Sequence, residues 1–472
     1  MNTSQRCRAF VAAFVLLAGD VSCRRAPHFR RGDAAAVVVV QRPKDGGAAP
    51  PAAEREPNNT PAEAQELVWA GAPATAAVKA TIDRSEPGRA ADIDVFKVVV
   101  PGPRIVASPD AGPPADPLAG AKRLSVIAQP EAGLALVLDL LDEGLHLVKT
   151  TVAAGPGETL GLPNMAVLPG GTYYLRAKAA LASKGRMAAD AGAPADHAYQ
   201  LAATLLDFDF ADEREPNDRL ESAGELAWQG RSALATGLYG WRRDEDWFRL
   251  PIEAIEPGWV LNVDLEAVEG VAASLGVSDS AGKKLVAVRG RKGEKLALRN
   301  LALPGAAGDA GVAGAGRWLY VVVRADGGLD REHRYVLRAE AAPPEGRGNV
   351  ETEPNDDAAQ ASALADGTTT GYLSVGDVDV FRYSAAGPRD LDIEVSPPSR
   401  VRIRIEILRE RDGQLLAEAA AGKARQPVSI RGFSCPAEPV LIRLSQGKHD
   451  GNAGDPYLLK VATRPTPSDA GR

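Results

Sequence analysis

Three segments of the chain begin with the same run of acidic and amide side chains. They read Glu54-Arg-Glu-Pro-Asn-Asn59, Glu213-Arg-Glu-Pro-Asn-Asp218 and Glu351-Thr-Glu-Pro-Asn-Asp356. A second acidic pair follows each run, as Asp92-Ile-Asp94, Asp244-Glu-Asp246 and Asp377-Val-Asp379. Alternate residues of an extended segment point the same way, so each run places its oxygen-bearing side chains on one side of the backbone.

The two acidic segments of each unit together predict a calcium site. Carboxylates that converge repel one another unless a cation lies among them. Calcium takes about six to eight oxygen ligands, whereas the scattered histidines, none paired with a cysteine, do not indicate a softer metal. The predicted ligands are Glu54, Glu56, Asn58, Asp92 and Asp94 in the first unit, Glu213, Glu215, Asn217, Asp218, Asp244 and Asp246 in the second, and Glu351, Glu353, Asn355, Asp356, Asp377 and Asp379 in the third.

Helix capping is the simpler alternative for these residues. Asn58 or Asp218 can cap a short helix, and the aspartate pair can end a loop. Capping accounts for one polar residue per unit, but it does not explain why Glu-x-Glu occurs in all three units. Asn59 replaces the aspartate in the first unit and removes a charge, so calcium is expected most clearly in the second and third units.

The elements that must position these acids are mostly β-strands. Short apolar or alternating runs, separated by Gly, Pro and Asp clusters, are typical of a sandwich or barrel. The predicted strands include Phe96 to Val100, Leu134 to Leu141, Tyr173 to Ala177, Leu261 to Leu265, Trp318 to Arg324 and Val401 to Leu408. Only the segment after each Glu-Pro-Asn has a helical pattern, for two turns, with Thr60 to Glu63 forming a capping box.

The repeated order of these motifs divides the chain into three domain-sized units. Each unit ends on a tyrosine-led strand, beginning at Tyr199, Tyr335 or Tyr457. Co-linear motifs at this spacing indicate tandem domains with their own cores. The predicted boundaries are 1–23 for a signal peptide, 24–53 for an Arg/Ala/Pro-rich tether, 54–210, 211–346 and 347–465 for the three domains, and 466–472 for a tail.

The N-terminal residues predict export. Arg6 and Arg8 precede an apolar run from Ala9 to Gly19, which has the layout of a secretory signal peptide. Val21-Ser-Cys23 resembles the end of a bacterial lipoprotein signal, so Cys23 is the predicted lipidation site, with plain signal cleavage as the alternative. The body of the protein then keeps only Cys435, which is expected to be a buried core residue.

The order Glu-Pro-Asn-Asp, then Asp-x-Asp-x-Phe, then a closing tyrosine strand resembles the bacterial pre-peptidase C-terminal (PPC) domain family. The family includes the collagen-binding domains of clostridial collagenases. The resemblance covers roughly residues 54 to 465 and implies three tandem jelly-roll-like antiparallel β-sandwiches. It also implies that acids of the leading segment and of the Asp-x-Asp loop hold calcium. The context departs from the family, because a tether and not a protease comes before the units in this sequence.

Composition and missing motifs exclude several classes of function. A net charge of −7 and a pI near 5.5 argue against nucleic-acid binding, and three cysteines exclude a disulfide-dense scaffold or a four-thiolate zinc site. The sequence has no His-Glu-x-x-His run, Gly-x-Ser-x-Gly elbow or phosphate loop, so no enzymatic activity is expected.

The expected function is therefore that of a non-catalytic exported protein of the bacterial envelope, in the periplasm or at the outer membrane or cell surface. Its calcium-stabilised β-sandwich array would bind or scaffold a protein or polysaccharide, with a lipid anchor to the membrane. Three alternatives remain open: a polysaccharide- or matrix-binding module, an accessory or inhibitor subunit of a secreted protease, and an unrecognised hydrolase.

Overall fold

The computed structural model describes residues 51–83, 92–104, 118–180, 197–253, 255–256, 258–303, 318–344, 349–447 and 450–464. The predicted signal peptide, the lipidation site Cys23 and the tether up to residue 50 lie outside the described residues. Across the described ranges, no helix combines the length and the hydropathy needed to cross a membrane. The compact unit from Ala48 to Arg472 contains all the strands discussed below.

Sandwich 1 consists of two five-stranded sheets. The first has the order β1 (Ala52–Ala53), β3 (Ala74–Ile82), β10 (His197–Asp207), β5 (Lys122–Pro130) and β8 (Leu160–Val167). The second has the order β2 (Gln65–Glu66), β4 (Ile93–Val99), β9 (Thr172–Ala179), β6 (Leu136–Leu141) and β7 (Leu147–Val152).

Sandwich 2 repeats this arrangement. Its first sheet has the order β12 (Trp228–Gln229), β13 (Ser232–Tyr239), β20 (Asp330–Ala342), β15 (Val260–Leu265) and β18 (Leu296–Ala302). Its second sheet has the order β11 (Gly224–Glu225), β14 (Glu245–Pro251), β19 (Trp318–Gly327), β16 (Ala272–Ser278) and β17 (Lys284–Lys292).

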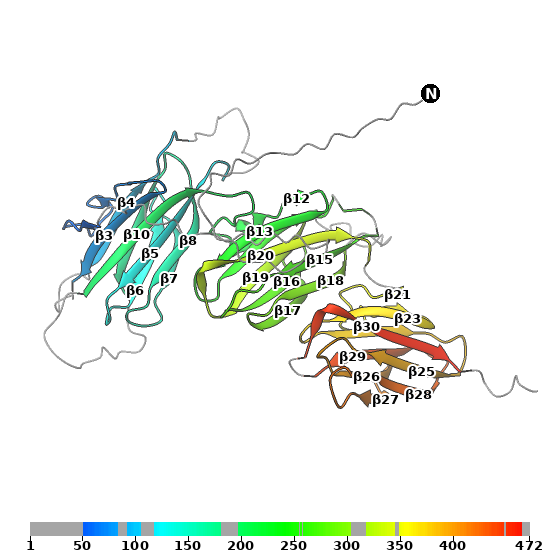
Figure 1. Ribbon diagram of the computed structural model, residues 1–472. Helices are drawn as coiled ribbons and strands as arrows, with labels where there is room; N and C mark the ends of the chain where they lie inside the picture. The colour runs from blue at the N-terminus through cyan, green and yellow to red at the C-terminus, as the bar shows by residue number, and fades with distance from the viewer. Residues whose placement is uncertain are drawn as a thin grey trace, which may run out of the picture. The chain divides into compact units, whose positions relative to one another are not determined.

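Sandwich 3 has the same topology again (Figure 1). Its first sheet has the order β21 (Asn349–Val350), β23 (Gly367–Leu373), β30 (Asn452–Thr463), β25 (Arg389–Ser396) and β28 (Val428–Cys435). Its second sheet has the order β22 (Ser362–Leu364), β24 (Val378–Tyr383), β29 (Val440–Gln446), β26 (Ile403–Arg409) and β27 (Leu415–Ala420).

The pairing pattern in each sandwich is nested. In sandwich 1, β3 pairs with β10, β4 with β9, β5 with β8 and β6 with β7, all antiparallel. An eight-stranded chain folded back on itself in this way over two sheets is a jelly roll. The predicted all-β class and the tandem β-sandwich architecture are therefore confirmed.

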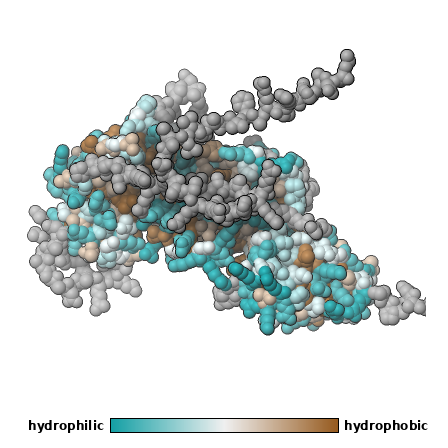
Figure 2. Space-filling model, viewed as in Figure 1, coloured by the Kyte–Doolittle hydropathy of each residue, from teal (hydrophilic) through white to brown (hydrophobic). Residues whose placement is uncertain are grey.

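Aliphatic side chains fill the interior of each sandwich. Alternating burial along the strands, as in β3 and β5, directs one face of each sheet inward. Three leucines that follow the acidic motifs, Leu67, Leu226 and Leu364, are buried, and the core of sandwich 3 includes Cys435, as predicted. On the face shown in Figure 2, hydrophobic residues are scattered in small groups among hydrophilic ones.

The predicted two-turn helices are wrong. The capping-box hydrogen bond from Thr60 Oγ1 to Glu63 Oε2 exists (2.8 Å), but residues 61–63 form only a turn. In sandwich 2 the corresponding segment is a single 3₁₀ turn, Leu220–Ser222. Two turns are too few to offset the cost of helix nucleation, so the segment instead connects the acidic motif directly to a short parallel strand.

Candidate metal centres

A recurring set of backbone contacts holds each Glu-Pro-Asn segment against its Asp-x-Asp strand. The motif asparagine accepts a hydrogen bond from the residue that follows the second aspartate. The donor and acceptor pairs are Val95 and Asn58 (3.0 Å), Trp247 and Asn217 (3.0 Å), and Val380 and Asn355 (2.9 Å). The Glu-Pro bond is cis in all three segments. The same local geometry therefore brings the two acidic motifs together three times.

Sandwich 3 holds the most complete cluster. Carboxylate oxygens of Glu351, Glu353 and Asp379 all lie within 4.8 Å of one another, and all three residues are buried. A second group of Glu353, Asp356 and Asp377 meets the same distance limit. Glu353 belongs to both groups, so the predicted ligands of this unit form one continuous acidic site.

Several polar atoms of this cluster lack a hydrogen bond of good geometry. Tyr457 donates its hydroxyl hydrogen to Glu351 (2.5 Å), and the Tyr372 backbone N–H donates to the same carboxylate. By contrast, no contact of good hydrogen-bond geometry reaches the Asp379 carboxylate or the Asn355 amide. Their polar neighbours are the Tyr457 hydroxyl, which faces Asp379, and the Glu351 carboxylate, which faces Asn355. Buried polar groups are nearly always satisfied. The cluster therefore contains buried oxygens that the described residues do not satisfy with hydrogen bonds of good geometry.

Burial changes the protonation of these acids. It raises the pKa of Glu351 to about 7, and burial together with the charges of Asp377 and Glu351 raises the pKa of Glu353 to about 10. The pKa of Asp377 rises to about 8, chiefly through burial. The pKa of Asp379 lies well above its ordinary value for the same reason. The folded protein can keep all four ionised near neutral pH only if a positive charge offsets them.

Sandwich 2 brings together Glu213, Glu215 and Asp246 within the same 4.8 Å limit, and all three are buried. The Tyr335 hydroxyl lies 3.0 Å from a Glu213 oxygen and 2.7 Å from an Asp246 oxygen. The Asn217 side chain also faces Glu215 and Asp246. Turned with its nitrogen inward it donates to both, at 3.3 and 3.1 Å, and turned with its oxygen inward it completes an all-oxygen set.

Two further predicted ligands of sandwich 2, Asp244 and Asp218, lie outside the group formed by Glu213, Glu215 and Asp246. Asp244 accepts a hydrogen bond from the Gly240 N–H at 2.6 Å, while its other oxygen has no partner. Asp218 is held by the ammonium group of Lys149, which lies 2.5 Å from the nearest carboxylate oxygen. This cluster therefore contains a cation that belongs to the protein.

Sandwich 1 has a more open cluster. Glu54, Glu56 and Asp94 meet the same distance limit, but Glu54 is only partly buried and Glu56 is exposed. Asp94 is buried, receives a hydrogen bond from Tyr199 (2.5 Å) and has a pKa raised to about 8, mainly by burial. Asp92 is not part of this group, because its carboxylate instead accepts a hydrogen bond from the Asp83 N–H (2.6 Å).

Two kinds of residue in these clusters were missed by sequence reasoning. The closing tyrosines, predicted only as strand starts, are the hydroxyl donors to the buried acids. Opposite Tyr335 and Tyr457 lie Gly237 and Gly371, where a Cβ would come within 2.3 Å of the tyrosine hydroxyl. The sequence carries a signal for these glycines. The second and third units share a Thr-Gly pair, Thr236-Gly237 and Thr370-Gly371, whereas the first unit has Lys79-Ala80 at the same place.

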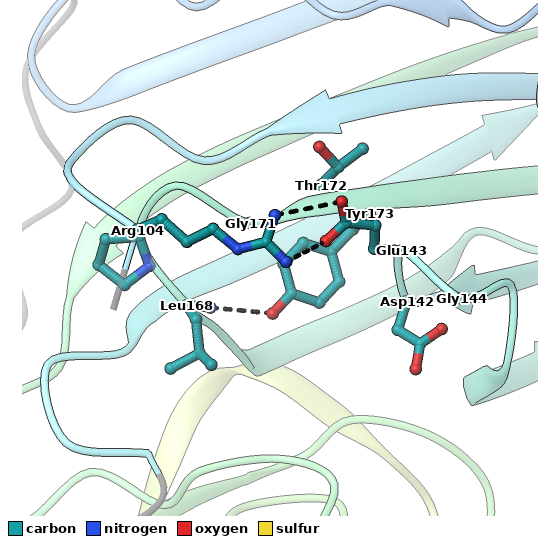
Figure 3. Close-up of a pocket in the computed structure, with 9 residues that line it drawn as sticks. Arg104, Asp142, Glu143, Gly144, Leu168, Gly171, Thr172 and Tyr173 are labelled. Carbon is teal, nitrogen blue, oxygen red and sulfur yellow. Dashed lines mark hydrogen bonds and ion pairs between the residues drawn. The ribbon is translucent and has the colours of Figure 1, made fainter. Parts of the chain in front are cut away.

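A separate pocket of about 220 Å³ lies in sandwich 1 (Figure 3). Arg104 makes two hydrogen bonds to the Glu143 carboxylate (2.8 and 3.3 Å), and the Tyr173 hydroxyl accepts a hydrogen bond from the Leu168 N–H (2.9 Å). The polar side chains of its walls are those of Arg104, Asp142, Glu143, Thr172 and Tyr173.

Comparisons with known proteins place few constraints on this chain. No family model matches the sequence, and no curated protein matches it. Among solved structures, the CUB1-EGF-CUB2 domain of human MASP-1/3 is 10% identical and aligns over 57% of this chain and 99% of that one, with a TM-score of 0.17.

A putative secreted protein from Parabacteroides distasonis is 9% identical over 58% of this chain and 91% of that one, with a TM-score of 0.16. A human norovirus GI.7 particle protein is 11% identical over 80% and 91%, with a TM-score of 0.17. Likenesses with such low TM-scores support no conclusion about function.

Proposed function

We propose that this protein is a non-catalytic exported component of the bacterial envelope, in which three calcium-stabilised β-sandwiches form an array that binds or scaffolds a partner. The resemblance to PPC domains and the N-terminal export pattern support this proposal. The partner is a protein or a polysaccharide of the periplasm or cell surface, and Cys23 anchors the array to lipid.

The acidic site of sandwich 3 is the observation that carries the calcium proposal. Asp379 is fully buried beside Glu351 and Glu353, and no contact of good hydrogen-bond geometry satisfies either of its carboxylate oxygens. An ionised carboxylate in such a place is strongly destabilising unless it is paired. The available ligand atoms are all oxygens, which calcium prefers, and no histidine or cysteine belongs to the two acidic groups of sandwich 3.

The residues of each cluster divide the work of binding. Glu351, Glu353 and Asp379 supply inner carboxylates, Asn355 supplies an amide oxygen, and Asp356 with Asp377 adds oxygens at the margin of the same site. A bound calcium ion supplies the positive charge that these acids lack. The chain's own residues then hold the leading segment against the Asp-x-Asp strand, which stabilises the sandwich that presents the binding surface.

Thermal unfolding with and without chelator tests the proposal. Saturating calcium at a hundredfold excess over Kd is expected to add about 2.7 kcal/mol to the stability of a one-site domain, and EDTA is expected to remove this gain. Isothermal titration counts the ions. Superimposable melting curves in EDTA and in millimolar Ca²⁺, together with no titration heat, would contradict the calcium proposal.

The variant Asp379→Asn assigns the effect to this site. It removes a buried charge whose oxygens make no hydrogen bond of good geometry, so the metal-free protein is expected to keep its stability while sandwich 3 loses its calcium response. Asp412→Asn is the matched control, since Asp412 lies in an exposed turn of the same sandwich. An unchanged number of bound calcium ions in Asp379→Asn would count against the assignment.

A further inference from the structure

The acidic motifs of sandwiches 2 and 3 also lie against the preceding sandwich. Parallel β-bridges join Met165 of sandwich 1 to Glu215 and Leu301 of sandwich 2 to Glu353. Backbone hydrogen bonds of 2.7–3.0 Å flank both bridges. We call these two contacts joint 1–2 and joint 2–3. In each of them, one glutamate of the acidic cluster is part of the contact between neighbouring sandwiches.

Joint 1–2 contains a lysine supplied by the preceding sandwich. Lys149 of β7 places its Nζ 2.5 Å from both oxygens of Asp218 and 3.6 Å from the centre of the Trp241 ring. Its side chain is only 13% exposed, and Trp241 is buried. A carboxylate on one side and an aromatic face on the other are the surroundings of a desolvated bound cation.

The charge of Lys149 reaches beyond Asp218. Burial raises the pKa values of Glu215 and Asp244 well above the ordinary range, and the ammonium group is an opposing positive charge at both. A second ion pair lies at the same joint. Asp212, whose side chain is 3% exposed, contacts Arg123 of sandwich 1 and Arg334 of sandwich 2. Joint 1–2 thus relies on cationic side chains of the chain itself.

Among the residues that the structure describes, joint 2–3 has apolar side chains at the positions of Lys149 and Asp212. Strand register places Val286 at the position of Lys149, because each faces its partner strand just before the same bulge. Val350 takes the place of Asp212, because Val350 pairs with Thr370 just as Asp212 pairs with the equivalent Thr236. At Asp356 of sandwich 3, burial raises the pKa and the charge of Lys284 from sandwich 2 opposes that rise.

We propose that Lys149 is a tethered cation: its ammonium group, provided by sandwich 1, docks sandwiches 1 and 2 through Asp218 whether or not calcium occupies the acidic cluster of sandwich 2, whereas joint 2–3 depends on a diffusible divalent cation. The half of this proposal that concerns joint 2–3 rests on the proposed calcium function. The half that concerns Lys149 does not, because the ion pair and the ring contact are made by the chain alone.

Hydrogen–deuterium exchange on the full chain tests both halves. The backbone amides of Ala166 and Glu215 report on joint 1–2, and those of Ala302 and Glu353 report on joint 2–3. Each of these N–H groups donates a hydrogen bond to a backbone carbonyl of the neighbouring sandwich. In EDTA, exchange at joint 2–3 is expected to accelerate about tenfold relative to Ca²⁺, while joint 1–2 keeps its rate.

Lys149→Met, which keeps the length of the stem and removes the charge, is expected to accelerate exchange at joint 1–2 about tenfold in EDTA. Calcium is expected to restore the slow rate, because a divalent ion in the acidic cluster of sandwich 2 then supplies the positive charge that Asp218 has lost. Lys149→Arg keeps the charge and is expected to behave as the wild type. Lys178→Met is the matched control, since Lys178 pairs with Asp139 within sandwich 1.

The outcomes separate the two proposals. If Lys149→Met in EDTA leaves joint 1–2 unchanged while the β5 and β10 amides stay protected, the tethered-cation proposal is overturned. If Lys149→Met loosens joint 1–2 but chelation never affects joint 2–3 in the wild type, Lys149 keeps its docking function and the calcium proposal fails. Equal acceleration by Lys178→Met and Lys149→Met would also overturn the proposal, since the effect would then be general.

Discussion

Sandwich 1 and sandwich 3 share a fold and an acidic motif, yet their acidic clusters differ in how far the glutamates are buried. In sandwich 3, Glu351 is buried between Tyr457 and the Tyr372 N–H. In sandwich 1, Glu54 accepts the equivalent backbone hydrogen bond from Thr81 (2.8 Å) but remains partly exposed.

The residue opposite the closing tyrosine differs between the two sandwiches. Ala80 faces Tyr199, whereas Gly371 faces Tyr457. A Cβ at position 371 would lie 2.2 Å from a Glu351 oxygen and 2.3 Å from the Tyr457 hydroxyl. The methyl group of Ala80 therefore restricts the space beside Tyr199 whose counterpart the first glutamate occupies in sandwich 3. In sandwich 2, Asn164 of the preceding sandwich also covers the first glutamate, by donating to Glu213 (2.8 Å). The comparison shows that identical ligand motifs do not guarantee identical sites, because a non-ligand residue controls the space.

The largest expected effect comes from Gly371→Ala. The added methyl group overlaps Glu351 and Tyr457, so sandwich 3 is expected to lose about 3 kcal/mol of stability and its calcium response. Hydrogen exchange of the β30 amides measures the loss. Gly387→Ala is the control in the same sandwich, since a Cβ there meets nothing within 4 Å. If both variants behave alike, Gly371 does not control the cluster.

The pH dependence of the metal-free protein is expected to be steeper for sandwich 3 than for sandwich 1. Folded pKa values of about 7 for Glu351, 10 for Glu353 and 8 for Asp377 exceed the unfolded values near 4, so the folded state binds extra protons. The stability they provide is complete below about pH 4 and is lost as pH rises through these values.

In EDTA, the melting temperature of sandwich 3 is thus expected to fall by roughly 5 °C or more between pH 5 and pH 9. In sandwich 1, Asp94 alone has a pKa near 8 among the grouped acids, so its fall is expected to be smaller. Calcium should flatten both profiles, because it binds the ionised carboxylates. If the two sandwiches show parallel pH profiles in EDTA, the deeper burial of the acids in sandwich 3 does not change its stability as proposed.

The smallest expected effect is that of Ala80→Gly, which gives sandwich 1 the glycine of its neighbours. Glycine in a strand lowers stability by about 0.5–1 kcal/mol, and the metal-free protein is expected to show this loss. With calcium present the loss should shrink, because Glu54 can then approach Tyr199. Ala76→Gly, in the same strand, is the control whose loss is the same in both buffers. An identical calcium dependence of the two variants would refute the role of Ala80.

Much of the architecture could be predicted from residue patterns. Alternating apolar runs predicted the strands, and three co-linear motif sets predicted three sandwiches, because a two-residue period and a buried face follow directly from strand geometry. The short helices could not be assigned correctly. The capping box at Thr60 is a real local interaction, but local capping does not decide whether a segment of two turns stays helical.

The site was only partly predictable for a related reason. Residue types and spacing predicted that Glu351, Glu353 and Asp379 would meet, since two short motifs on paired segments have few alternatives. The same reasoning placed Asp92 with its neighbours, although its carboxylate turns to the Asp83 N–H. Calcium binding, export and lipidation remain predictions, because they concern groups and steps beyond the described residues.

The order of residues was sufficient to specify the repeated sandwich and the convergence of its acids, because both depend on local periodicity and on motifs close in sequence. Tertiary folding decided how each cluster is closed and neutralised. Lys149 meets Asp218 across 69 positions of the chain, and Tyr457 meets Glu351 across 106. Contacts at such separations depend on strand register and on packing between whole sheets, which no short motif encodes.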